Sequence, residues 1–224
     1  MKITVVIPAY NEEKIIAKVV GQVKEKNQDV IVVDDGSSDA TAEAASQAGA
    51  KVIKHFLNRG QGAALRTGII FALRKGSDVI VTFDADGQHD AGDINKMIEP
   101  LLLGEFDVTL GSRFLESKFN DIPLAKVIIL KLAVWFTRLY TGLKVTDVHN
   151  GLRAFSKKSA GLIQLRQDGM AHASEILEEI KRHRLKFTEI PVTVSYTDYS
   201  LRKGQKISNS FRILWDLIIG RISR

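Results

Sequence analysis

Cysteine is absent from the 224 residues of this sequence. Its absence excludes disulfide bonds and thiolate metal sites, and it makes a location inside the cell the simpler expectation. Long apolar runs are also lacking, because no segment reaches the roughly 18–20 uncharged apolar residues that a membrane-spanning helix needs. The N-terminal stretch MKITVVIPAYNEE meets charged residues too early to resemble a signal peptide. We therefore expect an intracellular protein with no membrane span of its own.

The remaining composition is typical of one folded domain. Hydrophobic residues make up 45% of the chain and charged residues 26%, and 224 residues suit one large α/β domain. No internal repeat or low-complexity linker divides the chain. The net charge of +6 favours anionic partners such as nucleotides, phosphates, anionic lipids or nucleic acid, without choosing among them.

Apolar runs of strand type alternate with segments of helical periodicity up to about residue 112. We expect strands at 3–8, 29–35, 50–55, 78–84 and 106–112. We expect helices at 12–26, 38–48 and 60–73, and a fourth that Asp90 caps. This alternation predicts a mostly parallel sheet covered by helices on both faces. Beyond residue 113 we expect a short strand at 151–155, helices near 157–165 and 172–183, and a strand at 186–196.

Acidic residues follow three of the predicted strands. Asp84 and Asp86 end the fourth strand, PAYNEE (8–13) ends the first, and DDGS (34–37) ends the second. Parallel strands bring such ends to one edge of the sheet, where ligands bind. Carboxylates gathered there call for a cation or for donors such as ribose hydroxyls, and with Gln88 they suit Mg²⁺ or Mn²⁺. The alternative interpretation is that Asp84 and Asp86 only cap a turn.

Glycines at the start of the predicted helix 60–73 do not match a known phosphate loop. Gly60-Gln61-Gly62 lacks the third glycine of a dinucleotide fingerprint and the Gly-Lys-Ser/Thr of a P-loop. These glycines are interpreted as allowing close packing at the start of the helix.

Two apolar segments carry basic residues. Residues 124–140 are mostly apolar but include three cations, and residues 207–222 form one broad apolar helical stripe. The tail 202–224 holds six basic residues against one aspartate. Such helices can lie in a membrane interface, or they can be core or dimer helices, and composition fits either.

Several ordered motifs resemble those of family 2 glycosyltransferases with the GT-A fold. They are VVIPAYNEE, VVDDGSSDAT, LNRGQGAALRTG, DADGQHD, GSR and NGLRAF, and they cover nearly the full chain. Within that family the chain most resembles the polyprenyl-phosphate sugar transferases, which include dolichol-phosphate mannose synthase. The resemblance implies an α/β fold of the GT-A (Rossmann-like) type, a mostly parallel sheet flanked by helices, with C-terminal amphipathic helices. It implies a single domain: a nucleotide-binding half (1–112), an acceptor half (113–204) and an amphipathic C-terminal helix (205–224).

The resemblance also implies the reaction. This is inverting, metal-dependent transfer of a hexose from a nucleotide-diphosphate sugar, of GDP-mannose or UDP-glucose type, to a polyprenyl phosphate. The cofactor would be Mg²⁺ or Mn²⁺. The protein would lie in the cytoplasm, peripheral to the cytoplasmic membrane face, where a separate small membrane protein is a possible partner, and it would not bind nucleic acid.

The matched positions imply roles for individual residues. The nucleotide-sugar site would contain Pro8, Ala9, Tyr10, Asn11, Glu12, Asp35, Gly36, Asp84, Ala85, Asp86, Arg202 and Lys203. The metal ligands would be Asp84, Asp86 and Gln88. The acceptor phosphate would contact Arg113, Lys126 and Arg153, the last being a structural candidate as well. The catalytic residues would be Asp86, Arg113 and Glu175.

The chain departs from the family at its end. Dolichol-phosphate mannose synthases commonly carry Arg-x-x-Gly-x-Ser-Lys, where this chain has YSLRKGQK (199–206), and many have C-terminal membrane helices. The donor and the mode of membrane attachment therefore stay open. A glycan or protein hydroxyl acceptor, with Glu175 as base, is the alternative, because a hydroxyl must lose a proton whereas a lipid phosphate is already ionised. The alternative interpretation of Glu175 is a helix-start carboxylate favoured by the helix dipole.

Readings from other classes fit less well. A receiver domain would carry its acidic pair on the first strand, a haloacid-type phosphatase would need Thr or Val after Asp-x-Asp, and no nucleic-acid recognition motif is present. A binding subunit without activity is disfavoured by the intact Asp84, Asp86 and Gln88.

Overall fold

A computed structural model of the chain describes residues 1–26, 29–115, 134–135, 137–139 and 141–195. The predicted amphipathic helix at 205–224 and most of the apolar segment 124–140 lie outside these residues. Among the residues described, no helix is long and apolar enough to cross a membrane.

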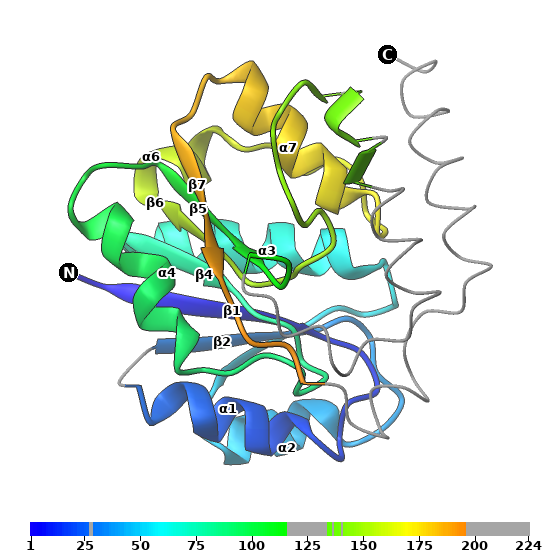
Figure 1. Ribbon diagram of the computed structural model, residues 1–224. Helices are drawn as coiled ribbons and strands as arrows, with labels where there is room; N and C mark the ends of the chain where they lie inside the picture. The colour runs from blue at the N-terminus through cyan, green and yellow to red at the C-terminus, as the bar shows by residue number, and fades with distance from the viewer. Residues whose placement is uncertain (27–28, 116–133, 136, 140, 196–224) are drawn as a thin grey trace.

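A seven-stranded sheet forms the centre of the molecule (Figure 1). Its strands are β1 (Ile3–Ala9), β2 (Asp29–Asp34), β3 (Lys51–Lys54), β4 (Val79–Thr82), β5 (Val108–Ser112), β6 (Arg153–Ser156) and β7 (Phe187–Pro191). They lie in the order β3-β2-β1-β4-β6-β5-β7. Only β6 runs antiparallel to its neighbours among these strands. The mostly parallel sheet expected from the sequence is thus confirmed.

Helices cover both faces of the sheet (Figure 1). On one face lie α1 (Ile16–Lys24), α2 (Thr41–Gln47) and α4 (Asp93–Leu102), and on the other α3 (Gln61–Arg74), α6 (Lys157–Leu162) and α7 (His172–Arg182). Along β1, Val5 and Ile7 pack into the first core and Val6 into the second. Strands covered on both faces need unbroken apolar runs, which explains why VVI and IVV replace an alternating pattern.

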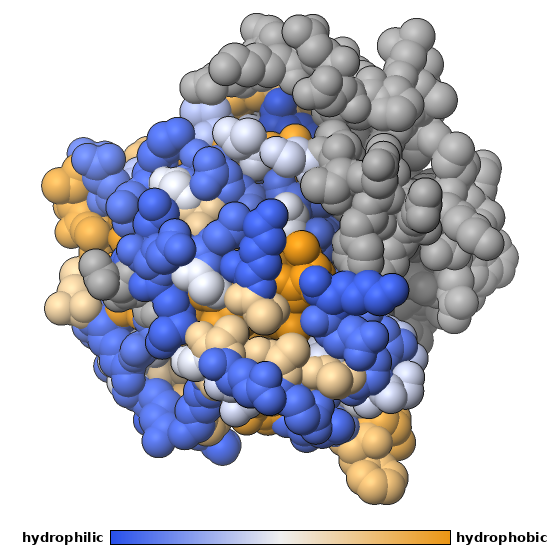
Figure 2. Space-filling view, turned by 90° about the horizontal axis from the view of Figure 1, so that it is seen from below, coloured by the Kyte–Doolittle hydropathy of each residue, from blue (hydrophilic) through white to orange (hydrophobic). Residues whose placement is uncertain are grey.

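Most of the predicted elements are present, with shorter ends. The strand predicted at 186–196 stops at Pro191, and it lies on the sheet edge as Pro191 suggested. Asp90 does not cap α4, because Gly92 occupies the N-cap position and the Asp90 carboxylate instead accepts a hydrogen bond from Gly92 N at 2.7 Å. Viewed from the side of α1 and α2, the surface is mostly hydrophilic, with apolar side chains near its middle and at its left and lower right margins (Figure 2).

Candidate active site

The candidate site lies at the carboxyl edge of the sheet, where β1, β2 and β4 end beside one another. The strand order reverses between β1 and β4, which is the kind of position where open parallel sheets bind ligands. The backbone of Asp35 donates a hydrogen bond to Ala9 O at 2.8 Å, so the ends of β1 and β2 are tied together. The three acidic strand ends therefore share one edge, as the sequence predicted.

Asp84 is held by two side chains. Gln61 Nε2 donates to one carboxylate oxygen and His89 Nε2 to the other, each at 3.0 Å. Burial alone would raise the pKa of Asp84. The hydrogen bond and charge of His89, with the charges of His172 and Arg153, outweigh burial and hold that pKa below its ordinary value. Asp84 is therefore a fixed, ionised carboxylate.

Asp86 has the opposite electrostatic character. Burial raises its pKa to about 6, and the negative charge of Asp84 adds to the effect, while Gln88 N donates to its Oδ1 at 3.0 Å and opposes it. A carboxylate in this position is incompletely compensated by the surrounding protein. A cation bound between Asp84 and Asp86 would supply the missing positive charge.

The donor set fits a hard divalent cation. Asp84 and Asp86 supply carboxylate oxygens one residue apart, and Gln88 follows two residues later; Mg²⁺ prefers such oxygens together with substrate phosphates. Within the described part of the chain, no group of three or more His, Asp or Glu side chains could hold a metal ion alone. A cation here would need further ligands from a bound molecule.

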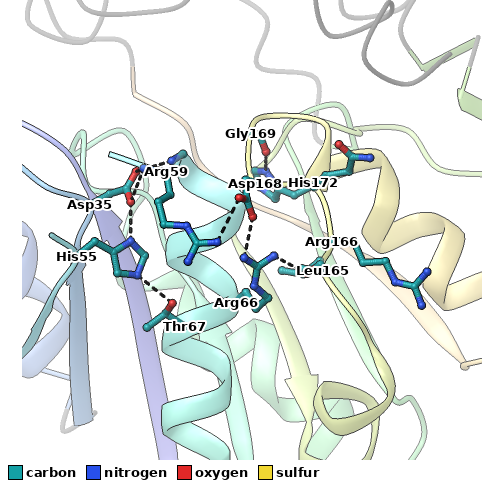
Figure 3. Close-up of polar contacts among 12 residues, drawn as sticks. Asp35, His55, Arg59, Arg66, Thr67, Leu165, Arg166, Asp168, Gly169 and His172 are labelled. Carbon is teal, nitrogen blue, oxygen red and sulfur yellow. Dashed lines mark hydrogen bonds and ion pairs between the residues drawn. The ribbon is translucent and has the colours of Figure 1, made fainter. Parts of the chain in front are cut away.

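Asp35 anchors the loop between β3 and α3 (Figure 3). Its carboxylate accepts hydrogen bonds from His55 Nδ1 at 2.7 Å, from Arg59 N at 3.1 Å and from Gly60 N at 2.6 Å. The other ring nitrogen of His55 shares a hydrogen bond with Thr67 Oγ1 at 2.9 Å. Asp35 thus has a structural function that the sequence did not predict, and its contact with a nucleotide stays a prediction.

The loop after β1 is bonded to the loop after β2. Asn11, with a φ of 54°, donates from its backbone to Ser37 Oγ at 2.9 Å, and its Oδ1 accepts from Ser38 N at 2.9 Å. Glu12 N donates to Thr41 Oγ1 at 2.7 Å. Of the residues assigned to the nucleotide, Pro8 and Ala9 end β1, Tyr10 is 46% exposed at the surface, and Gly36 and Ala85 lie in the two neighbouring loops.

A strap formed by residues 164–169 packs against the first turn of α3. A Cβ atom at Gly60 would overlap the carbonyl oxygen of Asp168, and one at Gly62 would overlap that of Gln167. Ala63 N donates to Asp168 O at 3.1 Å. The glycines of RGQG are therefore required for close packing, which confirms the interpretation made from the sequence.

Ion pairs fix the same strap to α3 (Figure 3). Arg66 donates to the Asp168 carboxylate at 2.7 Å and to Leu165 O at 2.9 Å, and Arg59 reaches Asp168 at 3.4 Å. Because Arg59 also binds Asp35 through its backbone, this residue connects the end of β2 with the strap.

Glu175 holds the strap from the other side. This side chain is buried in the first turn of α7, and its Oε2 accepts hydrogen bonds from Arg166 N and Gln167 N, both at 2.9 Å. One turn later, Glu179 accepts from Gln164 N at 3.2 Å. The geometry favours a structural function for Glu175 over that of a general base.

Arg113 and Arg153 differ in their surroundings. Arg113 Nε donates to the buried Asp147 carboxylate at 2.6 Å, just beyond the carboxyl end of β5. Arg153 is buried and donates to the backbone carbonyls of Val148, Asn150 and Ala173. Burial lowers the pKa of Arg153 to about 10, which leaves it charged at neutral pH. Its contacts favour the structural alternative over an acceptor-phosphate contact, whereas Lys126, Arg202 and Lys203 lie outside the described residues.

Comparison with known proteins decides the family, because the profile of glycosyl transferase family 2 matches residues 4–162. The chain belongs to glycosyl transferase family 2. It is 37% identical to the UDP-N-acetylglucosamine–dolichyl-phosphate N-acetylglucosaminyltransferase of Methanococcus voltae over 99% of this chain and 97% of that protein. It is 30% identical to the dolichol-phosphate mannosyltransferase of Pyrococcus furiosus over 97% of this chain and 64% of that protein.

The fold agrees with this family 2 membership. Glucosyl-3-phosphoglycerate synthase from Mycobacterium tuberculosis, solved in complex with Mn²⁺ and UDP-glucose, superposes with a TM-score of 0.74. The superposition covers 99% of this chain and 78% of that protein at 20% sequence identity, so it establishes a shared GT-A fold.

Sequence reasoning did not connect three side chains of this candidate site with Asp84. Gln61 and His89 bind Asp84, and His172 lies close enough for its protonated form to lower the pKa of that carboxylate. Burial lowers the pKa of His172 to about 4, with Arg153 contributing, and its Nδ1 donates to Gly169 O at 2.8 Å. Gln61 and His89 each lie within a motif named above, LNRGQGAALRTG and DADGQHD, whereas His172 lies outside these motifs.

Proposed function

We propose that this protein transfers a sugar from a nucleotide diphosphate to a polyprenyl phosphate at a membrane surface, with inversion. We choose a phosphate acceptor because the Glu175 carboxylate is already hydrogen-bonded to the backbone of the strap. The one carboxylate proposed as a base accepts two backbone hydrogen bonds of the strap. A hydroxyl acceptor needs a base, whereas a phosphate is already ionised at neutral pH. Relatives named as dolichyl-phosphate transferases support the same acceptor class.

The proposed reaction is one displacement. A phosphate oxygen of the acceptor forms a bond to the anomeric carbon as the bond to the donor diphosphate breaks, and no proton has to be removed. A divalent cation at Asp84, Asp86 and Gln88 would neutralise charge on the leaving diphosphate. Arg113, oriented by Asp147, would hold the acceptor phosphate. Lys126, Arg202 and Lys203 would add positive charge.

The nucleotide half of the site supports this orientation. The loop after β2, which contains Asp35 and Gly36, is hydrogen-bonded to the loop after β1, and both lie at the same sheet edge as the acidic loop that follows β4. A donor lying across these ends would direct its diphosphate toward Asp86 and its sugar toward Arg113. The sugar and the base stay open, with GDP-mannose and UDP-glucose types as the expected donors.

A direct assay tests the proposal. Purified protein with Mg²⁺ or Mn²⁺ is incubated with UDP-N-acetylglucosamine, UDP-glucose or GDP-mannose and a short-chain isoprenyl phosphate, and products are identified by mass spectrometry. We expect transfer from one donor, a loss of at least about 100-fold in Asp86→Ala, and near-normal transfer in Asp90→Ala. The Asp90 carboxylate is exposed and, among the residues described, accepts a hydrogen bond from the nearby Gly92 amide. Transfer to a sugar hydroxyl but to no phosphate would refute the proposed acceptor.

A further inference from the structure

We propose that the loop between β3 and α3 docks the protein onto an anionic lipid surface through an apolar tip, Phe56 and Leu57. The inference rests on the proposed function, because a polyprenyl phosphate is reached at a membrane. It assigns the contact to described residues of the site edge and not to the C-terminal segment.

Both side chains of the apolar tip are exposed to solvent. Phe56 is completely exposed, and the adjacent Leu57 is 58% exposed. Single apolar side chains on a surface are ordinary, whereas these two large neighbours on one loop form a small exposed apolar patch. Burial of both side chains in the acyl region of a bilayer would remove this apolar area from water.

The loop that carries the apolar tip is anchored at both ends. His55 N donates to Asp34 O at 2.8 Å, and Arg59 N and Gly60 N donate to the Asp35 carboxylate. Its main chain packs closely against Gly36: a Cβ atom added to Gly36 would lie 2.6 Å from Leu57 C and from Asn58 N. Because the loop is already held in place, binding through its tip would lose little conformational entropy.

Positive charge flanks the apolar tip on both sides. Lys54 and Arg59 are each about half exposed, at 52% and 48% of their side chains, and each has an acidic neighbour, Asp34 and Asp168 respectively. Apolar side chains between cations are characteristic of segments that enter the interface of anionic membranes. The exposed parts of these two paired cations could bind negative headgroups, so we infer an anionic lipid surface as the partner.

The apolar tip lies at the edge that holds the candidate site. β3 runs parallel to β2 and β1, so its carboxyl end and the loop beyond it share their edge with Asp35 and Asp86. Tyr10 after β1 and Leu115 after β5 are exposed large apolar side chains at the same edge. Docking through the tip would therefore turn the site toward the lipid.

The absence of cysteine allows a site-specific test on the full chain. A spin label is attached to Phe56→Cys and, as a control, to Leu103→Cys, which is 66% exposed beyond the C-terminal end of α4. On vesicles of phosphatidylglycerol and phosphatidylcholine, we expect the label at 56 to collide more with oxygen and less with a water-soluble nickel complex. The label at 103 should not change. A label at 56 that stays accessible to nickel on bound protein would overturn the proposal.

Binding measurements give a second, independent readout. Phe56→Ser with Leu57→Ser should weaken partition onto these vesicles by at least about tenfold, and Leu103→Ser should not. Transfer to a short-chain isoprenyl phosphate in solution should stay normal in the double variant. Failure of the proposed function would instead abolish that transfer in the unaltered protein. The docking inference is wrong if donor nucleotide alone, without vesicles, protects the label at 56 from the nickel complex. It is also wrong if the spectra of labels at 56 broaden without vesicles, because the tip would then contact a second copy of the protein.

Discussion

At the scale of single residues, Glu175 separates the two acceptor chemistries. Glutamine retains an oxygen that can accept from Arg166 N and Gln167 N, so Glu175→Gln should keep nearly normal stability and activity. Alanine leaves both amides without their acceptor, and Glu175→Ala should lose about 1–3 kcal/mol of unfolding free energy. Urea unfolding and the transfer assay measure both effects. If Glu175→Gln folds normally but is as inactive as Asp86→Ala, Glu175 acts as a general base and the acceptor is a hydroxyl.

Asp86 yields a prediction about pH. Its pKa rises from 3.8 to about 6 in the folded protein, so the folded state binds more protons than the unfolded chain between these values. Protonated Asp86 therefore adds to the free energy of unfolding below about pH 4, and this contribution is lost as the pH rises through about 6. Without metal at pH 8, Asp86→Asn should be more stable than the unaltered protein by roughly 1–2 kcal/mol, discounted for partial exposure.

Denaturant unfolding in a chelator, from pH 4 to pH 8, checks this linkage. The difference between the two proteins should grow with pH and should be small near pH 4. If the difference in unfolding free energy did not change with pH, ionised Asp86 would not be destabilising, and the electrostatic argument for a cation between Asp84 and Asp86 would fail.

At the scale of elements, the contact between the strap and α3 depends on a missing side chain. Gly62→Ala would place a Cβ against the carbonyl oxygen of Gln167, which is backbone and cannot rotate away. The control is Gly21→Ala in α1, where no atom of the described residues beyond its own helix backbone lies within 4 Å of the added Cβ. We expect Gly62→Ala to destabilise by at least about 1–3 kcal/mol and Gly21→Ala to stabilise by about 0.5–1 kcal/mol. Equal thermal shifts in both variants would contradict this account.

The elements also show how far the sequence could predict the site. The acidic strand ends were predictable because strand periodicity and the parallel topology bring them to one edge. The contact of Gln61 with Asp84 and that of the strap with Glu175 were not, because each joins two different elements and no local pattern indicates which side chains will meet. Arg153 matched a motif, yet its buried position only became evident once β6 was placed between β4 and β5.

At the scale of the whole molecule, the two halves proposed from the sequence share one sheet. β6, from the acceptor half, is inserted between β4 and β5 of the nucleotide half. Among the described strands, β5 pairs only with β6 and β7, both of which follow residue 112. Neither half can therefore complete its hydrogen bonds alone, and an unpaired buried strand is costly.

This interdependence predicts one cooperative unfolding transition for the chain. Calorimetric and van't Hoff enthalpies should agree, and donor with Mn²⁺ should shift that single transition upward, because a ligand of the native state stabilises all that unfolds with it. A chain cut after residue 112 should show no cooperative transition, since β5 would lack both partners. Two resolved transitions, or cooperative melting of residues 1–112 alone, would instead make the halves independent domains and confine donor stabilisation to the first.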